Sequence, residues 1–155
     1  MTQKTSTGRL LLGALYASIA VAIVVTAMLV VSRPTTTERK VILGGNEINV
    51  TIADTQATQA KGLGGRKSLK PNEGMLFIFP KSGFYGFWMK DMKIPIDIIW
   101  FDENYRIVDV WENATPDSYP KLYTPRVLSQ FVLEVPAGYF ARHHLKNGNI
   151  LEMIR

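Results

Sequence analysis

The sequence predicts an all-β fold, a compact β-barrel or jelly-roll-like sandwich preceded by one N-terminal transmembrane helix. Three observations predict it: an uncharged apolar segment, a series of short alternating stretches after residue 40, and turn residues between those stretches. Short strands with intervening turns favour a sandwich or barrel over βαβ units. We therefore expect a tail over residues 1–9, an anchor over 10–31, a linker over 32–40 and a β domain over 41–155.

The composition limits the chemistry that the chain can perform. It has no cysteine, which excludes disulfides, thiolate metal ligands and thiol nucleophiles. Most of the formal net charge of +5 lies at the front, where five basic side chains and one acidic one give residues 1–40 a charge of +4. The remaining +1 belongs to residues 41–155, and a nearly neutral domain does not predict a nucleic-acid partner.

The apolar segment from Leu10 to Val31 has the length of a membrane span. Its 22 residues contain no charge, and a helix at about 1.5 Å per residue would extend about 33 Å. A cleaved signal peptide is the alternative, but its apolar region is shorter, about 7 to 15 residues, and no good cleavage site follows Val31. Basic residues flank both ends, so their charges nearly cancel as an orientation signal. A short tail before the segment and a long domain after it favour a signal anchor, with the domain outside the cytoplasm.

The linker contains one proline and three threonines and reads as an extended tether. Beyond it, strands over 41–43 and 47–53 form an expected hairpin, because Gly44, Gly45 and Asn46 tolerate positive φ. A short helix is expected over about 56–61, with Asp54 as its N-cap and Gly62 at its end.

Six further strands are expected, giving about eight in all. Each is bounded by Pro, Gly, Asn or Asp, and they cover residues 74–79, 83–90, 96–101, 106–111, 130–135 and 149–154. Three prolines make residues 115–126 a long loop, a type of segment that is often functional. The expected core comprises Phe77, Phe79, Trp88, Ile98, Trp100, Val108, Val132 or Leu133, and Ile150.

Several motifs, in order, resemble the domain-of-unknown-function 192 family. They are GLGGRKSL, EGMLFIF, YGFWMKDMKIPIDIIWFDEN, a proline-rich loop, QFVLEVPAG and a final NGN before a strand, and they cover about residues 41–155. The resemblance implies a compact β-barrel or jelly-roll-like domain that often follows a signal or anchor segment, and it supplies no activity. Many members have a methionine after the first Gly-Leu, where this chain has Gly64.

The densest group of chemically useful residues runs from Trp88 to Asp97. One interpretation is a binding groove, in which aromatic faces stack on a sugar, nucleobase or peptide ring while Lys90, Asp91 and Asp97 fix its polar groups. The other is a core strand with buried alternate aromatics, Asp97 bonded to a turn and Lys90 in solvent. The candidate ligand-binding residues are Arg66, Trp88, Lys90, Asp91 and Asp97.

Arg66 follows a Gly-rich turn, where it could pair with Asp97 or Asp91, or bind a carboxylate or phosphate. The pair with Asp97 is the favoured use. Asp91 and Asp97 could also serve as the acid and base of a hydrolase, although carboxylate pairs are common. No catalytic residue is assigned, and the common hydrolase and nucleotide motifs are absent from the sequence.

No metal site or cofactor is predicted. His143 and His144 are neighbours that would point apart on a short helix, with no third ligand nearby. The sequence thus favours a membrane-anchored extracytoplasmic binding or accessory module whose partner is a small ligand, a cell-wall polymer or a protein. A hydrolase using Asp91 and Asp97 and a purely structural or protein-interaction domain are the alternatives.

Overall fold

A computed structural model describes residues 37–154, which lie within one compact unit that extends from Thr36 to Arg155. The predicted tail, anchor helix and most of the linker lie outside the described residues. Within 37–154, no helix combines the length and the hydropathy of a membrane span.

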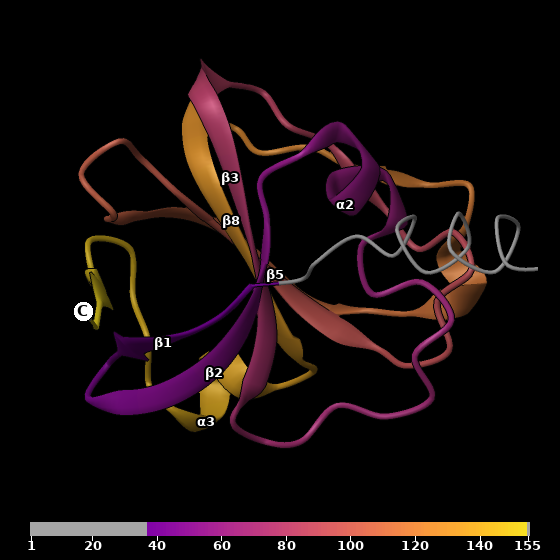
Figure 1. The fold of residues 1–155 in the computed structure, drawn as a ribbon, viewed down its shortest axis with the longest axis horizontal. Coiled ribbons are helices and arrows are strands. Elements are labelled where there is room, and N and C mark those ends of the chain that lie inside the picture. Colours follow the sequence, from indigo (N-terminus) through magenta and orange to yellow (C-terminus); the bar gives the residue numbers. More distant parts are fainter. Residues whose placement is uncertain (1–36, 155) are drawn as a thin grey trace, which may run out of the picture. The chain divides into compact units, whose positions relative to one another are not determined.

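The described unit is mostly β, as the sequence predicts (Figure 1). Its two short α-helices are α2 (Gln56–Lys61) and α3 (Tyr139–Arg142), and Pro116–Ser118 forms a 3₁₀ turn, η1. The strands are β1 (Glu38–Leu43), β2 (Asn46–Ala53), β3 (Glu73–Gly83), β4 (Phe87–Trp88), β5 (Ile96–Phe101), β6 (Ile107–Ala114), β7 (Leu122–Tyr123), β8 (Ser129–Pro136) and β9 (Leu151–Met153).

Seven strands form one curled sheet, a half-barrel, in the order β6-β5-β8-β3-β2-β1-β9. The edge strands approach each other through an isolated bridge between Arg106 and Ile150. The predicted hairpin is confirmed: β1 and β2 pair antiparallel, with Leu43 opposite Asn46. Gly44 and Gly45 form its turn with φ of +57° and +78°, a conformation that side chains with a Cβ rarely adopt.

The connection between β2 and β3 was not expected, because the sequence favoured a fold without βαβ units. β2 and β3 pair in parallel, with Thr51 opposite Met75, so the chain crosses over between them through α2 and the Gly-rich turn. A parallel pair requires such a crossover, because a tight turn can only reverse the chain. The crossover segment from residue 54 to residue 72 therefore covers one face of the sheet and is available to form a site there.

The sheet is buried on both faces. On one face Ile99, Leu133 and Val135 pack with Tyr139 of α3, and we call this cluster the α3-side core. On the other face Ile98, Trp100, Val132 and Phe77 pack with Leu63 and Met92 from the loops, and we call this cluster the cavity-side core. Neighbouring residues of a strand point to opposite faces, so β5 contributes to both cores and is apolar at all but one of its positions.

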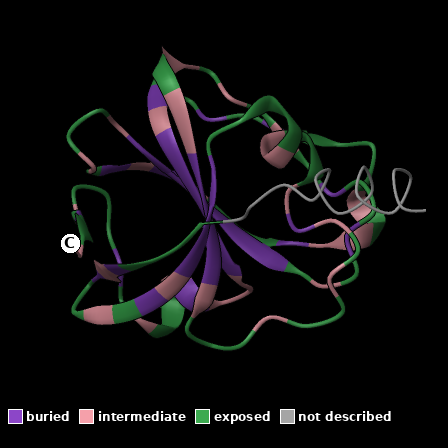
Figure 2. Ribbon diagram, viewed as in Figure 1, coloured by how far each residue is buried: buried purple, intermediate pink, exposed green. Residues whose placement is uncertain are grey.

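Burial concentrates in the central strands, and exposure in the turns and loops (Figure 2). Of the predicted core, Phe77, Ile98, Trp100, Val132 and Leu133 are buried, whereas Phe79 and Val108 are partly buried. Two members were predicted wrongly: Trp88 is 52% exposed and Ile150 is 45% exposed.

A second sheet explains the exposure of Trp88. β4 and β7 pair outside the main sheet, with Trp88 opposite Leu122, so the predicted strand 83–90 is in fact the end of β3, a loop and a two-residue strand. The proline-rich segment is a loop as predicted, except for η1 and the two residues of β7.

Candidate functional site

A cavity of about 680 Å³ lies on the cavity-side face of the sheet, a size within the range of about 300–1,000 Å³ typical of small-molecule sites. Its walls come from the end of α2 with the Gly-rich turn, the β3–β4 connection, and the start of the β4–β5 loop. Glu134 lines it from β8. Three of the sequence-predicted site residues, Trp88, Lys90 and Asp91, line this cavity.

The first wall begins with α2, which has its predicted bounds but is capped by Thr55 and not by the predicted Asp54. Thr55 is the N-cap: its hydroxyl accepts from the Thr58 amide, and the Thr58 side chain accepts from the Thr55 amide. Asp54 lies outside this capping box, and the predicted terminator Gly62 is the C-cap. Gln59 fixes the helix to the sheet, because its Nε2 donates to the Ile78 carbonyl over 2.9 Å.

The Gly-rich turn joins the two walls at one edge of the cavity. The Gly65 amide donates to the Asp91 carbonyl over 2.9 Å. A Cβ on Gly64 would lie 3.0 Å from the Lys61 carbonyl and 3.8 Å from that of Lys90, so the two segments approach closely here. Asp91 itself has φ of +58°, a strained conformation for a residue with a side chain, and such strain is frequent at ligand sites.

Aromatic side chains form the second wall. The indole of the buried Trp100 donates to the Tyr85 carbonyl over 2.9 Å and so fixes the loop between β3 and β4. Tyr85 stacks on Phe79 with centroids 3.5 Å apart, and Phe87 packs edge-on against Phe77 at 4.8 Å. These four rings all line the cavity, so its wall is held by packing that does not depend on a ligand.

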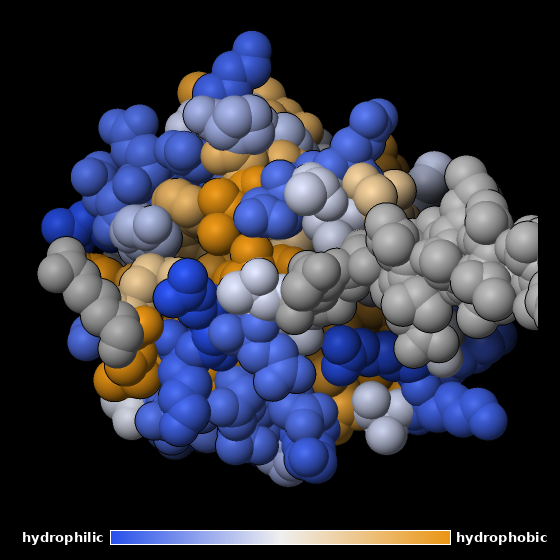
Figure 3. Space-filling view, in the orientation of Figure 1, coloured by the Kyte–Doolittle hydropathy of each residue, from blue (hydrophilic) through white to orange (hydrophobic). Residues whose placement is uncertain are grey.

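Trp88 projects from this wall toward solvent. Its ring lies 6.0 Å from that of Tyr119 and 5.9 Å from Nζ of Lys90, a cation–π arrangement. Phe84, which also lines the cavity, is 60% exposed. Figure 3 shows one face of the domain, on which apolar side chains reach a surface that is otherwise mostly hydrophilic. Exposed aromatic rings beside a cavity are available for contact with a ligand.

Glu134 is the one carboxyl group of the cavity lining that is buried. The residue is 5% exposed, and its Oε2 has no hydrogen-bond partner within the described residues. Burial raises the pKa of Glu134 to about 8, because an ionised carboxylate loses its hydration there. At neutral pH the group is therefore mainly a protonated acid that can donate a hydrogen bond.

Asp97 and Arg66 lie outside this cavity. The Asp97 carboxylate is fully buried and accepts three backbone amides: Asn113 and Gly138 at Oδ1 over 2.8 and 3.0 Å, and Phe140 at Oδ2 over 2.9 Å. Arg66 donates to the Thr51 hydroxyl over 3.3 Å. The expected Arg66–Asp97 pair is not among the ion pairs of residues 37–154. Thr51, the partner of Arg66, alternates with Val50 and Ile52 of the α3-side core and so lies on the opposite face of the sheet from Asp97.

The same geometry bears on the hydrolase alternative, which needs two carboxylates in one cleft. Asp91 lines the cavity and Asp97 does not. For metals, the described residues contain no group of three or more His, Asp or Glu side chains placed to hold an ion. His143 packs against the ring of Tyr139 with centroids 4.2 Å apart.

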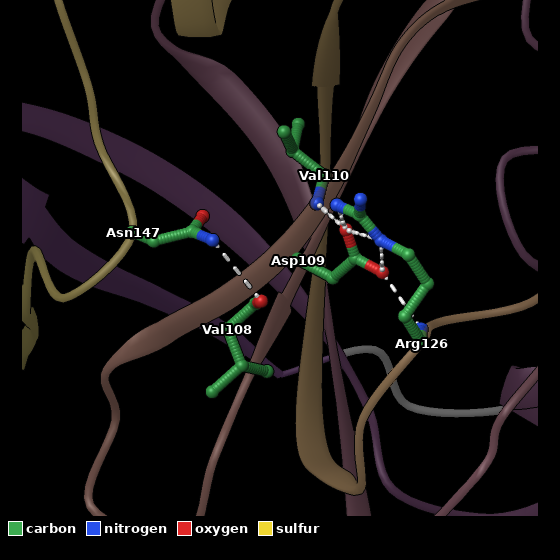
Figure 4. Close-up of polar contacts among 5 residues, drawn as sticks. All are labelled: Val108, Asp109, Val110, Arg126 and Asn147. Atoms are coloured by element: carbon green, nitrogen blue, oxygen red, sulfur yellow. Dashed lines mark hydrogen bonds and ion pairs between the residues drawn. The ribbon is translucent and has the colours of Figure 1, made fainter.

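An ion pair fixes the end of the proline-rich loop to the main sheet (Figure 4). Asp109 on β6 accepts the Arg126 backbone amide over 2.7 Å and also the Arg126 guanidinium. Burial acts to raise the pKa of Asp109, but the hydrogen bonds from Arg126 and from the Val110 amide outweigh it and hold that pKa below its ordinary value. The loop that carries Tyr119 to Trp88 is thus anchored beyond β7.

Glu134 and Lys61 line the cavity but were not predicted from the sequence. Glu134 alternates with apolar neighbours in QFVLEV, a pattern that predicts a solvent-facing side chain when only one face of a strand is buried. β8 is buried on both faces, because the crossover and the loops around β4 cover the face to which Glu134 points. Lys61 ends a helix whose position over the sheet follows from the parallel pairing.

Comparison with known proteins places this arrangement among relatives. The family model DUF192, described as uncharacterized ACR, matches residues 39–153. A UPF0127 protein of Pyrococcus horikoshii is 32% identical over 97 residues, which are 59% of this chain and 76% of that protein. A UPF0127 protein of Thermococcus kodakarensis is 28% identical over 107 residues, which are 66% of this chain and 62% of that protein.

Two crystal structures share the fold. One is a Sinorhizobium meliloti protein described as a candidate transcription regulator, with a TM-score of 0.74 and 28% identity over 79% of this chain and 98% of that chain. The other is a Novosphingobium aromaticivorans protein of unknown function, with a TM-score of 0.69 and 30% identity over 77% of this chain and 89% of that chain. The segment that the family model matches, residues 39–153, covers the curled sheet and does not include the apolar N-terminal segment.

Proposed function

The chain belongs to the DUF192 family, and from the cavity in its folded domain we propose that it is a ligand-binding module held at a membrane by residues 10–31. The proposal follows from one observation: the cavity gathers aromatic faces and a small number of polar groups from segments that are far apart in the sequence. Ligand sites commonly divide their work in this way, with apolar contact for affinity and polar groups for orientation.

The binding part of the proposal is supported by the rigidity of the aromatic wall. One hydrogen bond from Trp100 to the Tyr85 carbonyl and the packing of the rings fix Tyr85 and Phe87 in place, so a ligand would find a formed wall. A preformed site loses less conformational freedom on binding than a flexible one. The ligand is a small molecule or the end of a cell-wall polymer that presents a ring to Trp88 and Phe84.

The membrane part of the proposal is supported by the sequence. Residues 10–31 have the length of a bilayer core and no charge, and a short tail precedes them. The β domain is then extracytoplasmic, within reach of external ligands. Protease added to intact cells should digest residues 41–155 and leave the anchor, whereas complete protection of the domain contradicts this orientation.

A thermal melt of the full chain in lipid nanodiscs tests the binding proposal. The panel comprises sugars, cell-wall fragments, nucleotides and metal ions, and a ligand at 100 times its Kd stabilises the native state by about 2.7 kcal/mol. Trp88→Ala should abolish the shift. Trp111→Ala is the matched control, since Trp111 is also an exposed tryptophan, at 42%, but does not line the cavity.

Two outcomes contradict the proposal. One is the absence of a shift with every ligand of the panel. The other is a shift that Trp88→Ala and Trp111→Ala reduce equally, because the ligand would then bind elsewhere.

A further inference from the structure

The position of Glu134 narrows the class of ligand. Two buried polar side-chain atoms of the described residues lack a hydrogen-bond partner, Glu134 Oε2 and the Tyr139 hydroxyl, and of these two residues Glu134 alone lines the cavity. Buried polar groups are nearly always partnered, because burying one without a hydrogen bond costs free energy. An unpartnered carboxyl group at a cavity is therefore a place where a ligand atom completes the bonding.

The surroundings of Glu134 decide what kind of atom that is. Its neighbours across the sheet are Met75 on β3 and Ile98 on β5, both buried, and neither hydrogen-bonds Oε2. Because burial favours the protonated form, the group offers one O–H donor and a carbonyl acceptor. A hydroxyl group of a ligand, which both donates and accepts, matches this pair of functions.

The charged side chains at the edge of the cavity indicate a second chemical group of the ligand. Lys61 and Lys90 both line the cavity, and the turn at Gly64 brings their backbones close together. Neither lysine takes part in an ion pair within residues 37–154. Asp91 is the one other charged group of the lining, so with Glu134 protonated the lining carries a formal charge of +1. Such an edge attracts an acidic group and disfavours a cation.

We propose that the ligand is an acidic sugar, such as a uronic acid, whose ring lies against the aromatic wall. One ring hydroxyl exchanges hydrogen bonds with Glu134, and the acidic group lies between Lys61 and Lys90 at the edge. This inference rests on the proposed ligand-binding function and adds the substrate class of the same cavity. A sugar fits better than a purely aromatic acid, because an aromatic ring would leave Glu134 without a partner.

Equilibrium binding of three probes of similar shape tests the inference in the full chain in nanodiscs. D-glucuronate, D-glucose and D-glucosamine differ at neutral pH mainly in charge: negative, neutral and positive. We expect glucuronate to bind about tenfold more tightly than glucose, a difference of about 1.4 kcal/mol, and glucosamine to bind most weakly. Replacing both Lys61 and Lys90 with Ala should lower glucuronate affinity to that of glucose, whereas Lys93→Ala, a nearby lysine outside the cavity, should not.

The role of Glu134 has its own readout. Above pH 8 the wild-type affinity for glucuronate should fall about tenfold per pH unit, because an ionised Glu134 loses its proton and repels the acid. Glu134→Gln keeps a neutral donor and acceptor of the same shape, so it should bind at pH 7 within about threefold of wild type and show no such fall.

Several results overturn the inference. If glucosamine binds most tightly of the three and Glu134→Gln abolishes that binding, the cavity is a cation site. If glucose and glucuronate bind equally, the lysines have no role in binding. If another ligand of the panel binds through Trp88 and none of the three sugars binds, the inference fails while the proposed function stands. If no ligand of any kind binds, both fail.

Discussion

Two buried carboxyl groups lie on neighbouring central strands and project from opposite faces of the same sheet. Asp97 on β5 points to the α3 side, and Glu134 on β8 points to the cavity side. Asp97 accepts three backbone amides, whereas Oε2 of Glu134 has no partner within the described residues. Burial alone therefore does not tell which carboxyl group holds a fold together and which one is available to a ligand.

The difference has a structural cause. Asp97 is the second residue of β5, and on its face of the sheet the end of β6, the turn after β8 and the start of α3 direct amides toward it. Glu134 lies one position away in the register but on the opposite face, where its neighbours across the sheet are Met75 and Ile98. No amide of the described residues bonds Glu134 there, so Oε2 is available to a ligand or a solvent molecule.

Removing Asp97 should produce the largest loss of stability. Asp97→Ala removes a fully buried carboxylate and leaves three backbone amides without their acceptor, and we expect the free energy of unfolding to fall by about 4 kcal/mol. Urea denaturation measures the change. Asp54→Ala is the control, because Asp54 is exposed and outside the capping box, and it should change stability by less than about 0.5 kcal/mol. A loss below about 1 kcal/mol for Asp97→Ala would remove the contrast.

Glu134→Leu should act in the opposite direction. It replaces an unpartnered buried acid with an apolar group of similar size, so we expect a gain of about 1–2 kcal/mol in the free energy of unfolding. The same variant should lose binding of glucuronate. A clear loss of stability instead would mean that Glu134 has a structural partner, and the two carboxyl groups would then be alike.

The unpartnered Glu134 should also make the free energy of unfolding depend on pH. The pKa of Glu134 is about 8 in the folded protein against an ordinary value of 4.5, so between these values the folded state binds more protons than the unfolded state. Its contribution to stability is present below pH 4.5 and declines as pH rises to 8, by at most about 1.4 kcal/mol per pH unit. The stability of wild type minus that of Glu134→Gln, measured by urea denaturation across pH 4–9, should show this decline; a flat difference contradicts it.

Loss of the ion pair between Asp109 and Arg126 should have the smallest effect on stability. Its partner Arg126 is largely exposed, and the pair holds the pKa of Asp109 below its ordinary value, although burial acts to raise it. The stabilisation is therefore present above the ordinary pKa and is lost as pH falls through the lower folded value. Arg126→Ala should lower the Tm slightly at pH 7, and this deficit should shrink toward the acid end of a series of melts. A deficit that is independent of pH would assign the role of Arg126 to packing.

Much of the fold was predictable because its signals are local. Gly44 and Gly45 define a hairpin by the backbone conformation that their turn needs, and Gly62 ends α2 where the sequence predicts. β5 has its predicted bounds, since a short apolar run between Pro95 and the polar residues 102–104 is typical of a buried strand.

The parallel pairing of β2 with β3 could not be predicted in this way. Nothing local distinguishes a strand that pairs with its successor in parallel from one that pairs antiparallel. The site depends on that pairing, since the crossover brings Lys61 and the Gly-rich turn to the face where Glu134 and Trp88 lie. The sequence therefore indicates the Trp88–Asp91 part of the cavity lining and misses Glu134, while Arg66 and Asp97 lie outside the lining and bond to the Thr51 hydroxyl and to backbone amides.

The pairing of β1 with β9 has a consequence for how the domain is made. Val41 lies opposite Met153 and Leu43 opposite Leu151, so the first strand of the sheet is flanked on one side by the last. The β domain cannot complete its sheet until nearly the whole domain has left the ribosome. Sheets with such distant pairings fold slowly, in milliseconds to seconds.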